Sequence, residues 1–156
     1  MTNWIEPVEN AVAAMGGEPR ALSMLLPEYR PELVLALADA LGFRHCDFRR
    51  EVMAKAGEHA ADLPLSSVGA TVRALHEDGG SQSGLVLQNV EALLGVVTPE
   101  RRRAWFAEFV GSRQPMPVIL PVVLHGGDVP VGPHRLDMSA YMLPQDSLMM
   151  RLWAAS

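Results

Sequence analysis

An abrupt change from apolar to polar side chains within residues 84–94 constrains the fold of this chain most strongly. Leu85, Val86 and Leu87 form a short apolar run, and Gln88-Asn89 follows it directly. Such a run is typical of a strand buried on both faces between parallel neighbours and helices. In open α/β sheets, ligands bind beyond the carboxyl ends of such strands. The stretch therefore predicts a parallel α/β fold with function near its polar end.

Two further segments carry clear helix signals. Pro31 and Gly42 suit the first position of a helix and the position after its last residue. Since nearly every residue between them is apolar, we expect this helix to be packed on most sides. Thr98-Pro99-Glu100 begins a second helix, which continues to about Val110. Helices that alternate with strands predict βαβ units, a parallel sheet and a three-layer α/β fold.

Weaker patterns predict the remaining elements. Residues 21–26 fit either a strand or a helical turn. Residues 116–124 form the second strong strand, but Pro117 and Pro121 remove ladder donors, so this strand begins late, bulges or lies at an edge. The other expected elements are an amphipathic helix at 4–15, a strand at 43–48, a helix capped by Asp47, a helix after Pro64, a strand at 135–138 and a helix at 147–153.

Composition narrows the class of protein. The length of 156 residues suits a globular fold, and the formal net charge is −5, from 18 acids against 13 bases. A negative chain opposes non-specific binding to nucleic acid or to an anionic membrane. The single Cys46 excludes an internal disulfide and fits a reducing cytoplasm. No apolar run approaches the length of a membrane span, so no membrane partner is expected.

Familiar catalytic patterns are missing from the sequence. No G-x-x-x-x-G-K-[ST] phosphate loop occurs, and residues 80–84 place Gln82 where a nucleophile elbow needs Ser. No H-x-x-x-H or C-x-x-C spacing marks a metal site, and Cys46 is expected to be a small buried hydrophobe. We therefore expect no catalytic residue, no metal, no cofactor and no measurable ATP binding.

Residues 85–94 combine an apolar strand, a polar pair at Gln88-Asn89 and an apolar helix. A further helix, a break near Ser112-Arg113 and the apolar run 117–124 follow. In this order the chain resembles P-loop NTPases of the AAA-like type. More narrowly, it is similar to the small P-loop-like proteins of bacterial BREX phage-defence clusters (the BrxF type). The resemblance implies a degenerate P-loop-NTPase-like α/β domain at 31–156, after an N-terminal helical arm at 1–30.

The resemblance also implies roles for individual residues. Gln88 stands where a metal-binding Asp would be, beside Asn89, and Glu91 or a neighbour would act on water. The strand ending at His125 would carry a sensor group, and Arg113 is a candidate finger. Because the phosphate loop is missing, these five residues are expected to form a vestigial site rather than an active one.

A non-catalytic accessory or adaptor subunit of a bacterial multi-protein assembly is the function we expect, with antiphage defence as its setting. Its partners would be proteins, such as a larger ATPase or a defence effector, or a second copy in a homo-oligomer, with nucleic acid contacted only indirectly. Methionine and aromatic residues near the C-terminus fit either core packing or an interface. The interface candidates are Tyr141, Met149, Met150, Leu152 and Trp153.

Two alternatives remain open. The first is an enzyme of unrecognised type that uses Gln88, Glu91, His125 and Asp128 at the carboxyl ends of the two best strands. The second is a nucleic-acid accessory factor, in which Arg113 joins a basic rim with Arg44, Arg49 and Arg50. Arg101, Arg102 and Arg103 fan around their helix, so they are not expected to form one patch.

Overall fold

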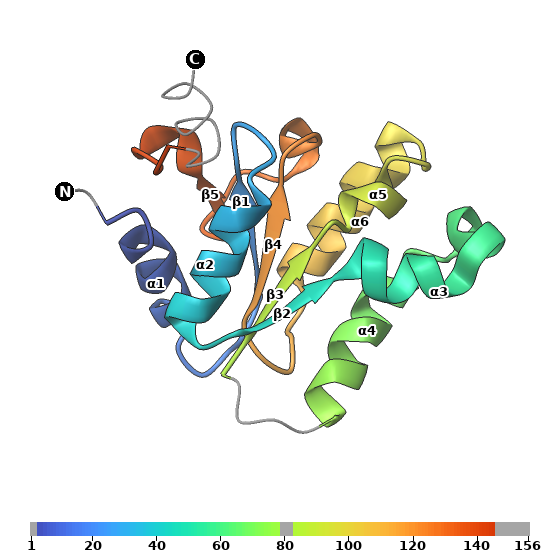
Figure 1. Cartoon of the computed structure of the whole chain (residues 1–156), viewed down its shortest axis with the longest axis horizontal. Coiled ribbons are helices and arrows are strands. Elements are labelled where there is room, and N and C mark those ends of the chain that lie inside the picture. The colour runs from blue at the N-terminus through green and yellow to red at the C-terminus, as the bar shows by residue number, and fades with distance from the viewer. Residues whose placement is uncertain (1–2, 79–82, 146–156) are drawn as a thin grey trace, which may run out of the picture.

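Five parallel strands form one sheet in the order β2-β3-β4-β1-β5 (Figure 1). The structure is a computed structural model that describes residues 3–78 and 83–145. The strands are β1 (Ala21–Leu25), β2 (Arg44–Asp47), β3 (Leu85–Gln88), β4 (Val118–Val122) and β5 (Arg135–Asp137).

Helices cover both faces of this sheet (Figure 1). One face carries α1 and α2, the other carries α4, α5 and α6, and the short helices η1, α3 and η2 extend from the end of β2. The three-layer α/β fold expected from the sequence is thereby confirmed. The helices are α1 (Glu6–Ala13), α2 (Pro31–Leu41), η1 (Arg49–Met53), α3 (Ala54–Ala56), η2 (Gly57–Asp62), α4 (Ser66–Glu77), α5 (Glu91–Leu94), α6 (Pro99–Gly111), η3 (Gly126–Asp128) and η4 (Met138–Ala140).

The strand side chains alternate between two hydrophobic cores, one on each face of the sheet. Leu22, Val86 and Ile119 pack toward α1 and α2, whereas Leu87 and Leu120 pack toward α4, α5 and α6. This period of two follows from strand geometry, and burial of both faces explains why the strands read as continuous apolar runs. The strand residues Leu85, Leu87, Val118, Leu120 and Val122 are each at most 1% exposed.

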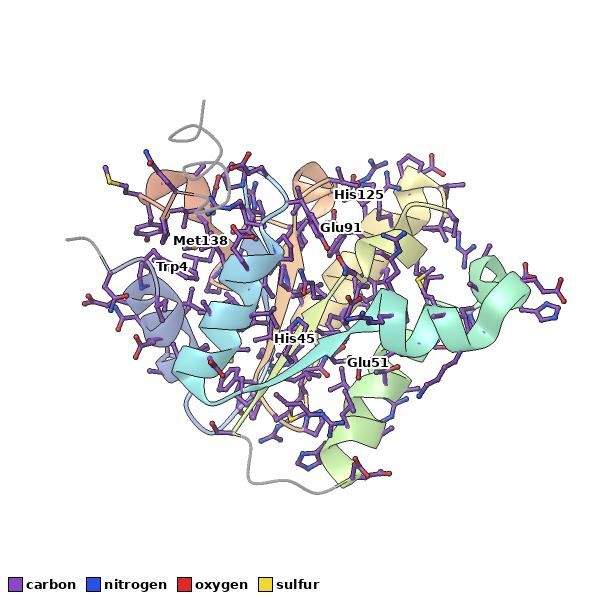
Figure 2. The ribbon with its side chains drawn as sticks, in the orientation of Figure 1. Trp4, His45, Glu51, Glu91, His125 and Met138 are labelled. Atoms are coloured by element: carbon purple, nitrogen blue, oxygen red, sulfur yellow. The ribbon has the colours of Figure 1, made fainter. Side chains whose placement is uncertain are left out.

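The first thirty residues contribute to both the sheet and the core. β1 lies between β4 and β5, so the segment expected at 21–26 forms a strand, Ala21–Leu25, rather than a helical turn. Trp4 and Val8 of the α1 region pack in the same core as Leu37 of α2 and Met138 of η4. Trp4 and Met138 lie on the same side of the molecule in Figure 2. Within residues 3–30, α1 and β1 are therefore integral to the α/β layers.

Local signals place most helix ends correctly. Gly42 follows α2 with a φ of 68°, a left-handed conformation that glycine adopts without strain. The hydroxyl of Thr98 accepts the N–H of Arg101 at 3.3 Å at the start of α6. A carboxylate oxygen of Asp47 likewise accepts the N–H of Arg50 at 3.2 Å. The helix expected at 147–153 lies outside the described residues.

The packing expected of α2 is wrong in one respect. Leu33, Val34 and Leu37 are buried, but Leu35 is 52% exposed and the outer side of the helix faces solvent. The sheet offers α2 one covered face, and α1 lies beside α2 rather than over it (Figure 1). The many apolar residues of α2 therefore predict burial on more sides of the helix than the structure provides.

Pro121 lies in the centre of the sheet rather than at an edge. The strand begins late, at Val118, whose N–H bonds to the carbonyl of Arg20 on the β1 side. Backbone groups of successive strand residues alternate in direction, so the missing N–H of Pro121 faces β3. Pairing between β3 and β4 ends at Val86 and Ile119. The proline therefore stands where these two strands separate.

We expect Leu87→Ala to lower the free energy of unfolding by about 2–5 kcal/mol, because it leaves a cavity beneath a fully buried side chain. Urea denaturation would measure this loss. Leu35→Ala, at an exposed position of α2, is the matched control and should change the stability little. A loss below about 1 kcal/mol for Leu87→Ala would contradict the central position of β3.

Candidate functional site at the carboxyl edge of the sheet

The carboxyl edge, meaning the loops that follow the strands, contains the switch point of the sheet. Strands β1 and β4 are neighbours, yet the chain leaves β1 toward β2 and leaves β4 toward β5 on the other side. Ligands of open α/β sheets bind in the crevice outside the strands at such a point. A ligand site is therefore expected among the residues around β1 and β4 at this edge.

Glu91 is bound by the backbone at this edge. One carboxylate oxygen accepts the N–H of Val123 at 2.6 Å, and the other accepts those of Leu124 and His125 at 2.8 Å each. Figure 2 shows Glu91 and His125 close together beyond the end of β4. Since both oxygens are occupied by N–H donors, the carboxylate of Glu91 serves as a structural acceptor in this arrangement.

The position of Glu91 follows from the separation of β3 and β4. The N–H of Val123 faces the β3 side, where the ladder has already ended. An unpaired backbone N–H is costly to bury, and a side-chain acceptor satisfies it. The carboxylate of Glu91 at the start of α5 takes the place that a carbonyl of β3 would occupy in an unbroken ladder. Nothing in the sequence signals this role, because it depends on the pairing of distant strands.

Gln88 is directed toward β2 and away from Glu91. Its Oε1 lies 2.7 Å from Nε2 of His45, and its side chain is buried with 5% exposure. The register pairs Gln88 with Asp47 across the two strands, so both side chains lie on the same face. A carboxylate at position 88 would place two like charges together in a buried setting, whereas the neutral amide avoids this cost.

Asn89 connects β3 to α5 in a left-handed conformation, with a φ of 67°. Asparagine tolerates this conformation better than most residues. Its Nδ2 donates to Oδ1 of Asp47 at 2.9 Å, and Asp47 itself caps η1. Asn89 is thus part of the framework that joins the ends of β2 and β3.

The backbone after β4 lies close to the end of β1. A Cβ placed on Gly126 would lie 3.2 Å from Cδ2 of Leu25, so the backbone after β4 rests on the end of β1. Nε2 of His125 is buried and has no hydrogen-bond partner among the described residues. It lies near the backbone of Gly95, where a Cβ would be 3.9 Å away. Among the residues of the expected site, His125 is the one whose side chain has a buried polar atom without a partner in the described structure.

Asp128 is held by two arginines. Its carboxylate accepts Nε–H of Arg102 at 2.7 Å and a guanidinium N–H of Arg103 at 3.4 Å. The hydrogen bond from Arg102 lowers the pKa of this carboxyl below its ordinary value of 3.8. Arg102 also donates to the carbonyls of Leu94 and Val97. Arg102 and Arg103 therefore meet at Asp128, whereas Arg101 lines a separate groove, so the three arginines do not share one patch, as expected. The sequence did not indicate Asp128 as the partner of Arg102 and Arg103.

The loop between β1 and α2 carries no phosphate-binding nest. Among the described residues, positive φ values occur at Asn89, Gly16, Gly42 and Gly57, and none of these lies in residues 26–30. The one basic side chain of this loop, Arg30, donates to a carboxylate oxygen of Glu32 and, at 2.7 Å, to the carbonyl of Pro144. Its charge is therefore already met by the protein.

A hollow of about 800 Å³ opens beside this loop, and we call it the β1–α2 hollow. It joins the loop after β1 to the segment after β5. Tyr141, expected at an interface, lies in its wall, whereas Met149, Met150, Leu152 and Trp153 lie outside the described residues. The lining residues are Pro27, Glu28, Tyr29, Arg30, Met138, Ser139, Tyr141, Leu143, Pro144 and Gln145.

Arg113 lies apart from the other expected site residues. Helix α6 runs from the carboxyl edge back to the amino edge, and Arg113 follows its last turn. The next residue, Gln114, donates its N–H to the carbonyl of Pro19, just before β1. The structure thus gathers Gln88, Glu91 and His125 at one edge and places Arg113 at the other. Arg113 instead lines a groove with Arg73 and Arg101.

Titratable ligands do not converge elsewhere in the described chain. Residues 3–78 and 83–145 hold no group of three or more His, Cys, Asp or Glu side chains placed to share a metal ion. Burial, together with the nearby Glu51 carboxylate, raises the pKa of the Cys46 thiol to about 12. Cys46 is buried in the core, as expected, and its thiolate is strongly disfavoured at neutral pH.

No helix in the described ranges has the length and apolar character to cross a membrane.

Comparison with known proteins finds no matching family model and no matching curated protein. The resemblance to P-loop NTPases and to the BREX-cluster proteins therefore stays a prediction.

We expect Glu91→Gln to lower the free energy of unfolding by about 1.5–3 kcal/mol, because a charged acceptor shared by three N–H groups is lost. Amide hydrogen exchange would locate the effect. Exchange at the amides of Val123, Leu124 and His125 should accelerate relative to the amides of β4. Glu100→Gln, at an exposed position of α6, is the control. Unchanged protection of these three amides would show that Glu91 does not hold them.

Asp128→Asn should lower the free energy of unfolding at neutral pH by about 1.5–3 kcal/mol, since it removes a charged hydrogen-bond partner of Arg102. A carboxyl whose pKa is lowered by folding stabilises above its unfolded pKa and loses this contribution as the pH falls through its folded pKa. The gap between wild type and variant should therefore narrow below about pH 4. Thermal unfolding across this range would measure it, with Asp62→Asn as control. A gap independent of pH would exclude the ionic role.

Proposed function

We propose that this chain is a non-catalytic accessory subunit of a cytoplasmic assembly and docks onto a protein partner through its carboxyl edge. The observation that carries this proposal is the β1–α2 hollow with its apolar surroundings. Tyr29 and Tyr141 lie in its wall, and several loops of the chain carry exposed apolar side chains. These side chains and their exposed fractions are Tyr29 58%, Val96 57%, Leu124 78%, Val131 87% and Met142 78%.

Solvent-exposed apolar side chains on loops carry a physical cost that a partner would remove. Five of the six large hydrophobic residues exposed in the described chain lie outside helices and strands, and the sixth, Leu35, lies on α2. Tyrosine and methionine are enriched in interface cores, because they combine large area with adaptable packing. A partner that inserts a side chain into the hollow would contact Tyr29 and Tyr141 in its wall.

The polar groups of the same edge support binding rather than chemistry. Glu91 is occupied by backbone donors, Asp128 by arginines and Gln88 by His45. A general base or nucleophile needs an unengaged group within reach of its substrate. The enzyme alternative rests on His125, whose Nε2 has no partner in the described structure.

The resemblance supplies the proposed setting. Strand β3, with Gln88 at its end, lies beside β4, whose end leads to His125, and this adjacency is compatible with a P-loop-like sheet that has lost its phosphate loop. We accordingly propose a bacterial assembly, with antiphage defence as the first setting to test. A larger ATPase, a defence effector or a second copy of this chain would be the partner.

Affinity purification of the tagged full chain from its native host tests this function. We expect wild type to co-purify with a protein partner in fixed proportion. Leu124→Asp combined with Met142→Asp should abolish this association, because both changes place charges in the proposed interface. The thermal midpoint of the isolated chain should barely move, since both side chains are largely exposed.

Leu35→Asp is the matched control, because Leu35 is an exposed leucine on a different face. This variant should retain the partner. Recovery of wild type as a lone monomer would overturn the proposed function. Equal loss of partner in the control and in the double variant would overturn the choice of the carboxyl edge.

A further inference from the structure

A second concave surface lies between α4 and α6, on the face of the molecule that these helices cover. We call it the α4–α6 groove, and its volume is about 490 Å³. The β1–α2 hollow is lined by one arginine and one glutamate, whereas this groove is lined by three arginines and one glutamate. The lining residues are Leu65, Ser66, Gly69, Arg73, Arg101, Ala104, Trp105, Glu108, Phe109, Ser112, Arg113, Gln114 and Pro115.

Three arginines from different segments converge on this groove. Arg73 comes from α4, Arg101 from the first turn of α6 and Arg113 from the segment after α6. Glu108 is the one acid in the lining, so the groove carries three positive groups against one negative group in a chain of net charge −5. This local excess of positive charge is opposite in sign to the charge of the whole molecule.

These arginines differ from those that the fold already pairs with carboxylates. Arg30, Arg102 and Arg103 each form an ion pair with a carboxylate. Within the described residues, the side chains of Arg73, Arg101 and Arg113 form neither an ion pair nor a hydrogen bond. A guanidinium presents a rigid fork of donors that matches a carboxylate with two parallel hydrogen bonds. The groove therefore offers an acidic ligand three guanidinium groups that have no partner in the described structure.

The floor between the arginines is aromatic. The rings of Trp105 and Phe109 stack with centroids 4.7 Å apart, and Phe109 is buried whereas Trp105 remains partly exposed. Gly69 of α4 also lines the groove, and Nη1 of Arg73 lies beside it, 3.4 Å from where a Cβ would be. The groove therefore presents a surface that accepts a flat apolar group beside the positive charges.

We propose that the α4–α6 groove binds an acidic segment of a partner protein, with carboxylates on the three arginines and an apolar or aromatic side chain against Trp105. Charge complementarity and the aromatic floor favour this occupant. Nucleic acid is disfavoured, because binding to its backbone needs an extended positive field, whereas this chain is negative and Glu108 interrupts the groove. The site is independent of docking at the carboxyl edge.

Fluorescence anisotropy with a defined probe tests this proposal on the full chain. The probe is a fluorescein-labelled synthetic peptide of Asp and Glu with one central Phe. Its control has every Asp and Glu replaced by Asn and Gln, and a second control replaces Phe by Ala. We expect saturable binding of the acidic peptide, none of the amide peptide and weaker binding of the Ala peptide.

Charge reversal locates the site. The triple variant Arg73→Glu, Arg101→Glu and Arg113→Glu should weaken binding at least about tenfold, because charge-assisted hydrogen bonds are replaced by repulsion. The matched control reverses three exposed charges outside the groove, with Arg49→Glu, Arg50→Glu and Lys55→Glu. The control should bind as wild type does. Circular dichroism of both triple variants would verify that they remain folded.

Each other outcome overturns the proposal. Equal weakening in both triple variants would show a general effect of net charge. Tighter binding of a labelled oligo-dT than of the peptide would assign the groove to nucleic acid instead. Absence of saturable peptide binding by folded wild type would leave the groove without its proposed ligand. None of these outcomes affects co-purification through the carboxyl edge, so the two proposals fail separately.

Discussion

The contact between Glu91 and the backbone after β4 organises the carboxyl edge of this molecule. Pro121 interrupts the sheet between β3 and β4, and one carboxylate then receives the N–H groups of Val123, Leu124 and His125. The chain can therefore turn away from the sheet and rest Gly126 on Leu25. The buried ring nitrogen of His125 lies at the end of this contact, next to the last of the three N–H groups that Glu91 holds.

The fold was accessible from the sequence wherever the signal was local. Apolar runs marked β3 and β4, and Thr98 and Gly42 marked helix ends, because strand burial and helix capping act within a few neighbouring residues. The candidate site was less accessible. The acceptor role of Glu91 depends on where two strands separate, and the position of Arg113 depends on the direction in which α6 runs. Neither follows from spacing along the chain.

The arginines show how a charge count conceals chemistry. Arg102 forms an ion pair with Asp128, and Arg30 forms ion pairs with Glu28 and Glu32. Arg73 and Arg101, with Arg113, face solvent around an aromatic floor and have no internal partner in the described structure. A net charge of −5 describes the far field of this chain, whereas recognition depends on which cations remain unpaired at a concave surface.

Glu91 can also be regarded as a tethered ligand of the amides after β4. A row of N–H groups at the end of a parallel strand would attract any small anion, including phosphate. Here the covalently attached carboxylate holds them at an effective concentration at least on the order of millimolar, as for short tethers. A free anion could bind these amides only by displacing the attached carboxylate. Glu91 therefore acts as a built-in competitor at a position where other chains could accept an anion.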